Sequence, residues 1–261
     1  MDKATLVGIV LALGGILLGL VIEGGNVGQV IQPTAAMIVF GGTLGAILIQ
    51  FPMGVVLKAF RRLANVFLEG GENARSTIEM LVKYANQARR DGIVSLDGEL
   101  ANIQDPFLRR SLMLAVDGTE PQELRKIMEL ELDNQEEQDE KIPQLVEAAG
   151  GFSPTIGIIG AVLGLIQVMQ HLDKIDEVGK GIAVAFVATI YGVGAANLFL
   201  LPVAGKLKIR IREEQIIREM TLEGVISILE GMNPRMLEEK LLGFLVSDDK
   251  ETAPMAQAAR V

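Results

Sequence analysis

The sequence predicts an all-α membrane protein with four transmembrane helices, a helical cytoplasmic domain between the second and third of them, and a cytoplasmic helical tail. Two observations support this fold class. Of the 261 residues, 49% are apolar and 29 are glycine, and the mean hydropathy is +0.37, which is typical of a membrane protein. In addition, four apolar runs lack ionisable residues over about the 20 helical residues that a hydrocarbon core requires.

The four apolar runs are the predicted spans: Ala4–Ile22, Thr34–Phe51, Ala148–Gln170 and Gly181–Val203. The first run could be a signal peptide, but the residues before it are barely basic and no small-residue cleavage motif follows Ile22. We therefore interpret it as a retained span.

The Lys and Arg residues predict the orientation of the spans, because cytoplasmic loops near membrane ends collect them. They follow the second and fourth spans, at Lys58, Arg61, Arg62, Lys206, Lys208, Arg210 and Arg212. Connector 23–33 has no Lys or Arg, and connector 171–180 has two Lys against three acids. We expect both connectors outside, with both termini, the domain 52–147 and the tail 204–261 in the cytoplasm.

Helical spacing of apolar residues organises the cytoplasmic parts. A predicted helix contains Ile78, Leu81 and Ala85, between Asn73 as its N-cap and Gly92 as its stop. Residues 129–140 carry seven acids and no base, which predicts a solvated helix face. In the tail, Asn233-Pro234 predicts a capped helix start with proline at the first helical position.

Composition also excludes several function classes. Without cysteine the chain has no thiol nucleophile and no Cys-ligated metal site, and a single histidine leaves little for imidazole chemistry. A net charge of −9 argues against nucleic-acid binding, which needs a concentrated positive field. We expect no enzymatic activity, cofactor, metal or nucleic acid.

Two prolines lie inside the third and fourth predicted spans. Pro154 cannot donate to the carbonyl of Gly150, and Pro202 cannot donate to that of Leu198. The prolines are either simple kinks or the freed carbonyls line a polar path, to which Thr155 could add a hydroxyl. Thr189 and Asn197 offer further polar groups, although a threonine can also bond back to its own helix.

Neither of these two spans contains Asp, Glu, Lys or Arg. An ion carrier generally needs a titratable group inside the membrane. If this chain conducts ions, a partner must therefore supply the carboxylate. Small residues form stripes that favour close helix packing in lipid: Gly15 and Gly19; Gly41 and Gly45; and Gly157, Gly160 and Gly164.

Several segments resemble the A-subunit of the bacterial flagellar motor stator, the MotA family of the MotA/TolQ/ExbB proton channel superfamily. The resemblance covers nearly the whole chain, and motif order, spacing and topology agree. The segments that carry it are Gly151–Gly164, Ala188–Gly192 with Asn197, Leu201-Pro202, Gly231–Arg235, Ala88–Gly92 and Leu108–Leu112.

The resemblance implies a homopentamer in the lipid of the bacterial inner membrane, around two copies of a MotB-like, single-span, peptidoglycan-binding subunit. The transmembrane aspartate of that subunit would accept the ion, and ion flow would turn the ring against the rotor's FliG-like switch-complex protein. Pro154 and Pro202 match the family's functional prolines. Arg89 and Asp97 match its rotor-binding charges, with Arg90 beside them, although many family members carry Glu at the place of Asp97.

The resemblance also bears on the coupling ion. Sodium-driven relatives carry a threonine seven residues after the third-span proline, and here that place is Ala161, while the fourth-span Thr189 is retained. A dehydrated hard cation needs several oxygen ligands, so alanine favours protons. Two alternatives stay open: an ExbB/TolQ-type energiser, which has three spans and its large cytoplasmic segment after the first, and a membrane transporter.

Overall fold

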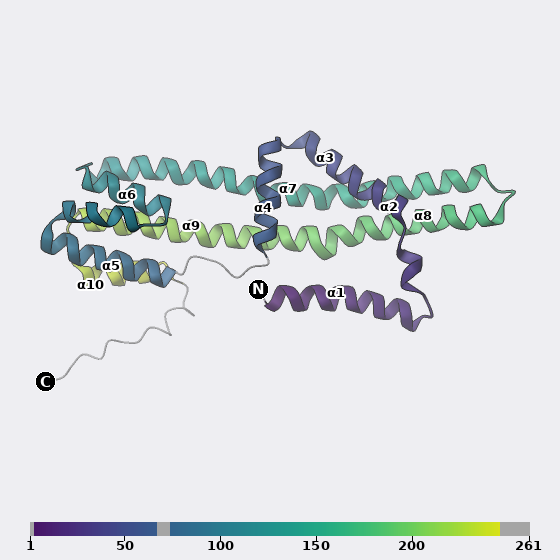
Figure 1. Ribbon diagram of the computed structural model, residues 1–261, viewed down its shortest axis with the longest axis horizontal. Coiled ribbons are helices and arrows are strands. Elements are labelled where there is room, and N and C mark those ends of the chain that lie inside the picture. The colour runs from purple at the N-terminus through teal and green to yellow at the C-terminus, as the bar shows by residue number, and fades with distance from the viewer. Residues whose placement is uncertain (1–2, 67–73, 246–261) are drawn as a thin grey trace. The chain divides into compact units, whose positions relative to one another are not determined.

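The computed structural model describes residues 3–66 and 74–245, and every regular element in those ranges is helical. The chain divides into two compact units. The first contains residues 1–70 and 138–209, and the second contains residues 71–137 and 210–261. Two long helices contribute residues to both units (Figure 1).

The first unit begins with the two N-terminal apolar runs, which are helical as predicted. The first run forms α1 (Lys3–Ile22), and the 3-10 turn η1 (Val27–Val30) follows it in the connector. The second run is α2 (Pro33–Ala36), the π-helical segment η2 (Met37–Gly41) and α3 (Gly42–Gln50). Helix α4 (Met53–Val66) completes this part and runs across α7 instead of along it (Figure 1).

Helix α7 (Pro121–Gln170) is 50 residues long. The third predicted span corresponds to its C-terminal part: the helix ends at Gln170, as the predicted span does, but it begins 27 residues before Ala148. Residues 121–147 are rich in Glu, Leu and Gln, which favour helix, and Pro143 lies inside the helix without ending it.

The fourth predicted span is also part of a longer helical stretch. Helix α8 (Ile175–Gly194), the π-helical segment η4 (Ala195–Leu200) and α9 (Leu201–Leu229) follow one another without a break. Helix α8 begins six residues before Gly181, so part of the predicted connector 171–180 is helical. Within residues 3–66 and 74–245, four helical stretches are long and apolar enough to cross a membrane, judged by length and composition.

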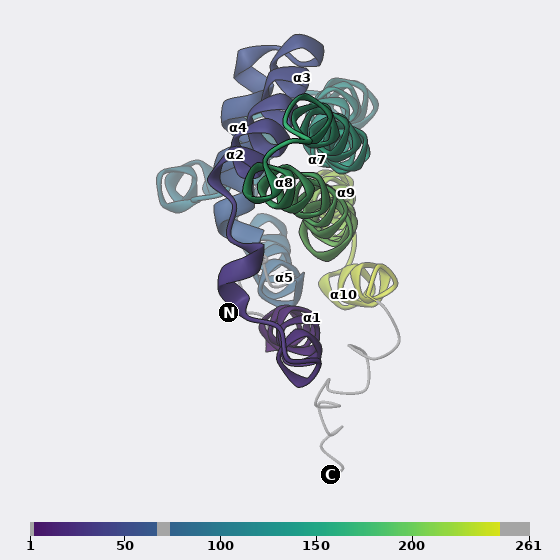
Figure 2. The ribbon, with the colours of Figure 1, turned by 90° about the vertical axis from the view of Figure 1, so that its right-hand side faces the viewer.

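Helices α7 and α8 lie side by side in both ribbon views (Figures 1 and 2), and glycines line their contact. A Cβ built on Gly157 would lie 2.8 Å from the carbonyl oxygen of Ala188, and one on Gly164 would lie 2.7 Å from that of Gly181. The backbones approach this closely only because no side chain separates them. The predicted packing role of the third-span glycines is confirmed, whereas built Cβ atoms on Gly15, Gly19, Gly41 and Gly45 meet no atom of the described chain within 4 Å.

The second unit packs shorter helices on the ends of the two long ones. These are α5 (Ala74–Asp91), the 3-10 segment η3 (Ile93–Asn102), α6 (Pro106–Val116) and α10 (Pro234–Leu242). Their apolar faces form one core with α7 and α9, which includes Leu81, Leu112, Met128, Ile226 and Leu237.

Two predicted helix boundaries in the second unit are confirmed. Gly92 follows the last residue of α5 and has a φ of 86°, a conformation that favours glycine and stops the helix. The Asn233 side chain accepts a hydrogen bond from the Arg235 backbone N–H at 3.0 Å, with Pro234 at the first helical position. The predicted N-cap Asn73 lies outside the described residues.

The two compact units do not follow the predicted domain boundaries residue by residue. Residues 52–66 and 138–147 pack with the apolar helices, where Val56 and Ala59 of α4 contact Ile142 and Val146 of α7. A division by contacts is not a division by membrane depth. The boundaries 1–51, 52–147, 148–203 and 204–261 therefore stay predictions.

An ion-pair cluster in the second unit leads to a test of its stability. Glu223 of α9 accepts hydrogen bonds from Arg125 Nη2 of α7, at 2.8 Å, and from Lys240 Nζ of α10. Burial alone would raise the pKa of Glu223, but the hydrogen bonds from Lys240 and Arg125 outweigh it and hold the pKa below its ordinary value of 4.5.

We expect Glu223→Gln to lower the stability of the purified assembly at neutral pH by about 1 to 2 kcal/mol, because two cations lose their carboxylate. A depressed carboxyl pKa contributes stability that is present above the unfolded-state pKa and lost as pH falls through the folded-state value. The difference in Tm between wild type and variant should therefore shrink below about pH 4.5. A difference independent of pH would contradict this role.

Candidate functional site

The two span prolines belong to one contact between α7 and the α8–α9 stretch. Gly192 of α8 lies directly against Pro154, because a Cβ built on it would be 3.2 Å from the Pro154 Cα. A Cβ built on Gly150, whose carbonyl Pro154 leaves free, would lie 2.7 Å from a methyl of Leu201. Leu201 directly precedes Pro202. The structure therefore brings both interrupted hydrogen-bond ladders to the same pair of helices.

Pro202 follows a local change in helix type. In η4 the Leu201 N–H donates to the carbonyl of Ala196, five residues earlier, where an α-helix would use the carbonyl four residues earlier. Such π-helical turns insert an extra residue into a helix and often occur at functional sites. Pro202 itself is exposed, and the helix continues beyond it as α9.

The polar side chains near the prolines donate their hydrogens to their own helices. Thr155 Oγ1 donates to the Phe152 carbonyl at 2.8 Å, and Thr189 Oγ1 donates to the Ala185 carbonyl at 3.1 Å. Asn197 does the same toward the Val193 carbonyl. Their oxygens can still accept hydrogen bonds, so these groups can support a water or a proton donor without titrating themselves.

Ala161 and Thr189 lie on neighbouring turns of the two packed helices. Ala161 follows Gly160, whose built Cβ would lie 2.7 Å from the Ala188 methyl, and Thr189 follows Ala188. The Ala161 methyl is half-buried and offers no oxygen to a cation. At this level of the contact, Thr189 therefore supplies the side-chain oxygen and Ala161 supplies none.

Sequence reasoning assigned no role to Tyr191, although it is one of only two tyrosines. Its hydroxyl donates to the Val30 carbonyl at 2.6 Å and accepts from the Gln32 N–H at 3.2 Å. Its ring stacks on Phe40 with centroids 6.0 Å apart. Tyr191 thus ties α8 to the segment that leads into α2. A phenol hydroxyl inside an apolar run requires a hydrogen-bond partner. The position of Tyr191 in the fourth apolar run could therefore have indicated a contact with another segment.

The sequence analysis also assigned no role to Ser153. Its side chain is 1% exposed, and its hydroxyl has no hydrogen-bond partner among the residues that the structure describes. Its backbone carbonyl lies against Gly192, since a Cβ built there would be 2.6 Å away. A buried hydroxyl directly before Pro154 adds an unsatisfied polar group at this contact.

The predicted rotor-facing charges are all exposed but are not equivalent. Arg90 donates to both carboxylate oxygens of Asp91, with Arg90 Nη2 2.8 Å from Asp91 Oδ2. Within residues 3–66 and 74–245, Arg89 and Asp97 form no ion pair. Arg89 and Asp97 therefore present unneutralised charge, whereas the charge of Arg90 is already matched within its own helix.

The fold and the site define a membrane channel subunit, built from packed apolar helices that carry oxygens and freed carbonyls but no Asp, Glu, Lys or Arg in their paired spans. Comparison with known proteins agrees. The model of the MotA/TolQ/ExbB proton channel family matches residues 99–220, and that of the motility protein A N-terminal region matches residues 6–92. The chain belongs to the MotA family of flagellar stator subunits, which form an ion channel.

Individual relatives match along the whole chain. The motility protein A of Bacillus subtilis (strain 168) is 36% identical over 254 residues, which cover 96% of this chain and 93% of the relative. The solved structure of C. jejuni MotAB matches with a TM-score of 0.90 at 33% identity, covering 97% of this chain and 99% of that one. The flagellar MotAB stator complex from Bacillus subtilis matches with a TM-score of 0.85 at 35% identity, covering 96% and 98%. The ExbB/TolQ-type and transporter alternatives are therefore set aside.

Proposed function

We propose that this stator subunit spans the bacterial inner membrane four times, with residues 4–22, 34–51, 148–170 and 181–203 in the bilayer. Both termini, the domain 52–147 and the tail 204–261 lie in the cytoplasm. The positions of Lys and Arg after the second and fourth spans support this orientation. The four helical stretches of sufficient length support the number of spans.

The channel is completed by a MotB-like subunit that carries the ion-accepting carboxylate. The observation that carries this proposal is the absence of Asp, Glu, Lys and Arg from residues 148–170 and 181–203 in a member of a proton channel family. The similar solved structures are complexes named MotAB, which supports a partner of that type. In the proposed assembly five copies of this chain surround two copies of the partner.

The proposed ion is the proton. Pro154 and Pro202 free carbonyl oxygens on the same helix contact, and Thr155 and Thr189 keep acceptor oxygens beside it. Ala161 supplies no oxygen, so the set is short of the several hard ligands that a dehydrated sodium ion needs. A proton passing through water to a partner carboxylate needs fewer direct ligands.

Swimming of a strain that depends on this stator tests the proposal. We expect swimming speed to collapse with a protonophore and to stay unchanged when sodium is replaced by potassium. Ala161→Thr should slow rotation and leave it independent of sodium, because one added oxygen does not complete a sodium site. Motility of the unmodified protein that rises with sodium concentration would overturn the assignment of the ion.

Torque passes to the rotor through the cytoplasmic domain. Arg89 and Asp97 contact complementary charges on a FliG-like switch-complex protein, and Arg90 stands beside them. The exposure of all three residues and the absence of an ion pair for Arg89 and Asp97 in the described chain support this surface. Charges at such a rim orient and steer the contact more than they strengthen it.

Charge changes on this surface should separate Arg89 from Arg90. Exposed pairs contribute about 0 to 1 kcal/mol each, so Arg89→Gln should slow swimming without abolishing it, and Arg90→Gln should slow it less. The double reversal Arg89→Glu with Asp97→Lys should stop most cells, and complementary reversals on the rotor should restore part of the motility. If the double-reversal variant swims as wild type does, Arg89 and Asp97 are solvated surface residues that do not act on the rotor.

A further inference from the structure

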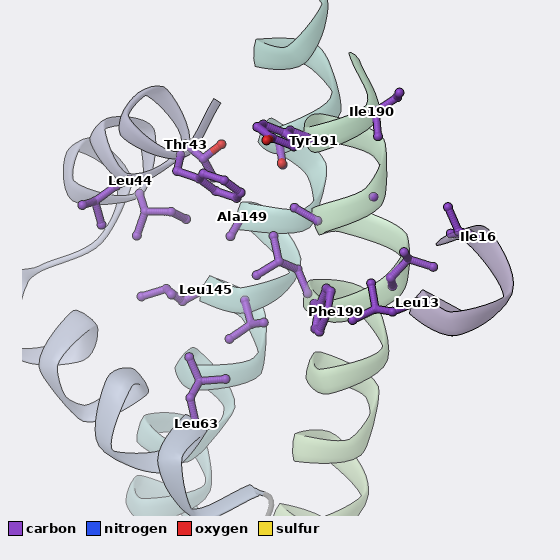
Figure 3. A pocket seen from close by; sticks show the side chains of 18 of the residues that line it. Leu13, Ile16, Thr43, Leu44, Leu63, Leu145, Ala149, Ile190, Tyr191 and Phe199 are labelled. Atoms are coloured by element: carbon purple, nitrogen blue, oxygen red, sulfur yellow. The ribbon is translucent and has the colours of Figure 1, made fainter. Parts of the chain in front are cut away.

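The first unit contains an apolar cavity of about 760 Å³ (Figure 3). Its walls come from α1, the α2–α3 region, α4, α7 and the α8–η4 stretch, and no charged side chain lines it. The labelled side chains of Leu13, Thr43, Leu145 and Phe199 surround the space from four of these elements (Figure 3). Of the hydroxyl groups that line it, those of Thr43 and Tyr191 donate within the chain, whereas the Ser153 hydroxyl has no partner among the described residues.

The cavity is open to the surroundings of the unit. Three of its lining residues are themselves largely exposed: Ile16 by 56%, Phe40 by 53% and Phe60 by 59%. All three belong to helices at or beside the proposed spans. The proposed membrane placement puts hydrocarbon chains, not water, outside this opening.

Helix α4 carries both exposed apolar residues and basic residues. Val56 and Ala59 are buried against α7, whereas Met53, Leu57 and Phe60 form an exposed apolar stripe with spacing i, i+4, i+7. The helix has three basic residues and no acid: Lys58, Arg61 and Arg62.

The basic residues of α4 differ in how far they are already paired. Arg61 is exposed and forms no ion pair within the described residues. Lys58 is exposed and donates to the neutral amide of Gln138 at 3.2 Å, so its charge is not neutralised there. Arg62 lies 4.0 Å from Asp139. Unmatched positive charge therefore lies on α4 within one helical turn of Phe60, which lines the cavity.

We propose that this cavity is a binding site for an anionic phospholipid of the cytoplasmic leaflet. One acyl chain fills the apolar cavity past Phe60, and the phosphate is held by Arg61 and Lys58. An apolar cavity that opens beside unneutralised cations matches the two parts of such a lipid, an acyl chain and a negative headgroup. The site rests on the proposed membrane placement, since it requires α4 at the cytoplasmic surface.

The chain contains no tryptophan, so a single introduced tryptophan reports on its own surroundings. Phe60→Trp keeps an aromatic side chain at the cavity opening. The assembled stator carrying this variant is reconstituted in nanodiscs with lipids brominated on the acyl chains, which quench nearby indole fluorescence. Brominated phosphatidylglycerol and brominated phosphatidylcholine are compared at equal mole fraction. The same complex with the unmodified chain supplies the partner's background signal.

We expect brominated phosphatidylglycerol to quench the indole fluorescence of the Phe60→Trp variant about two- to fivefold more than brominated phosphatidylcholine, because each basic residue near the surface enriches anionic lipid severalfold. When Lys58→Gln and Arg61→Gln are added to Phe60→Trp, the two brominated lipids should quench the indole fluorescence equally. Lys126→Gln, which removes an exposed charge of the second unit, should change nothing.

The variant Leu11→Trp distinguishes an error in the proposed lipid site from an error in the proposed membrane placement. Leu11 is 69% exposed on α1 and does not line the cavity, so both brominated lipids should quench it equally. Equal quenching by the two lipids at both positions would show ordinary surrounding lipid and overturn the site. Quenching at Leu11→Trp but not at Phe60→Trp would show protein, such as a second copy of the chain, over the opening, and would also overturn it. No quenching at either position would overturn the membrane placement itself.

Discussion

Replacing Gly192 by alanine should destabilise the α7–α8 pair and stop motility. A Cβ at this position would lie 2.6 Å from the Ser153 carbonyl oxygen, 3.1 Å from the Gly157 Cα and 3.2 Å from the Pro154 Cα. All three are backbone atoms, so no side chain can turn aside, and the helices must separate. Overpacking of this kind costs about 1 to 3 kcal/mol and also displaces Pro154. The Tm of the purified assembly and its abundance in membranes would measure the first effect, and swimming the second.

Gly194→Ala is the matched control on the same helical stretch. A Cβ built on Gly194 meets no described atom within 4 Å, so only the conformational freedom of glycine is lost. Alanine is favoured over glycine in a helix interior by about 1 kcal/mol, so this variant should be as stable as wild type or slightly more stable. Equal Tm values for the two variants would show that the close approach at Gly192 does not hold the pair together.

Pro154→Ala should reduce ion flow and torque strongly while the stator still assembles. The change returns an N–H donor to the carbonyl of Gly150 and removes the irregularity in α7, at the level where Gly192 and Leu201 contact that helix. No bulk is added, so packing should survive. Swimming speed measures torque, and the amount of MotB-like subunit that copurifies with the chain measures assembly.

Pro143→Ala provides the comparison for Pro154→Ala. Pro143 also lies inside α7 and also leaves a carbonyl free, but it lies outside the predicted span, 11 residues earlier. If the local carbonyl matters, this variant should swim nearly as wild type. Equal loss of torque in both variants would instead indicate that the general bend of α7 is required, and loss of copurification in Pro154→Ala would indicate a packing role.

Part of the fold could be predicted because lipid restricts the choices of the backbone. An apolar run without charges can satisfy its N–H and C=O groups in hydrocarbon only by forming a helix or a closed barrel, and about 18 or more such residues indicate a helix. For this reason α1, the α2–α3 region and the end of α7 at Gln170 agree with the prediction. Gly92 ended α5 as expected because positive φ favours glycine.

Other features could not be predicted because local signals conflicted. The sequence placed residues 52–147 in a domain separate from the span that begins at Ala148, yet residues 121–170 form one helix, since packing of Ile142 and Val146 on α4 supports the helix through Pro143. The start of α8 before Gly181 was missed because charged residues outside the apolar run can continue a helix.

The sequence by itself determined the membrane class, the helical runs, the missing carboxylate and the family, because these depend on composition, local periodicity and motif order. Only the tertiary structure decided which backbone each glycine touches, that Tyr191 binds a carbonyl 161 residues away, and that Gly192 packs on Pro154 while Leu201 packs on Gly150. The same holds for the cavity beside α4. Such contacts arise where helices distant in sequence pack, and their partners are set by the three-dimensional arrangement, which no local pattern specifies.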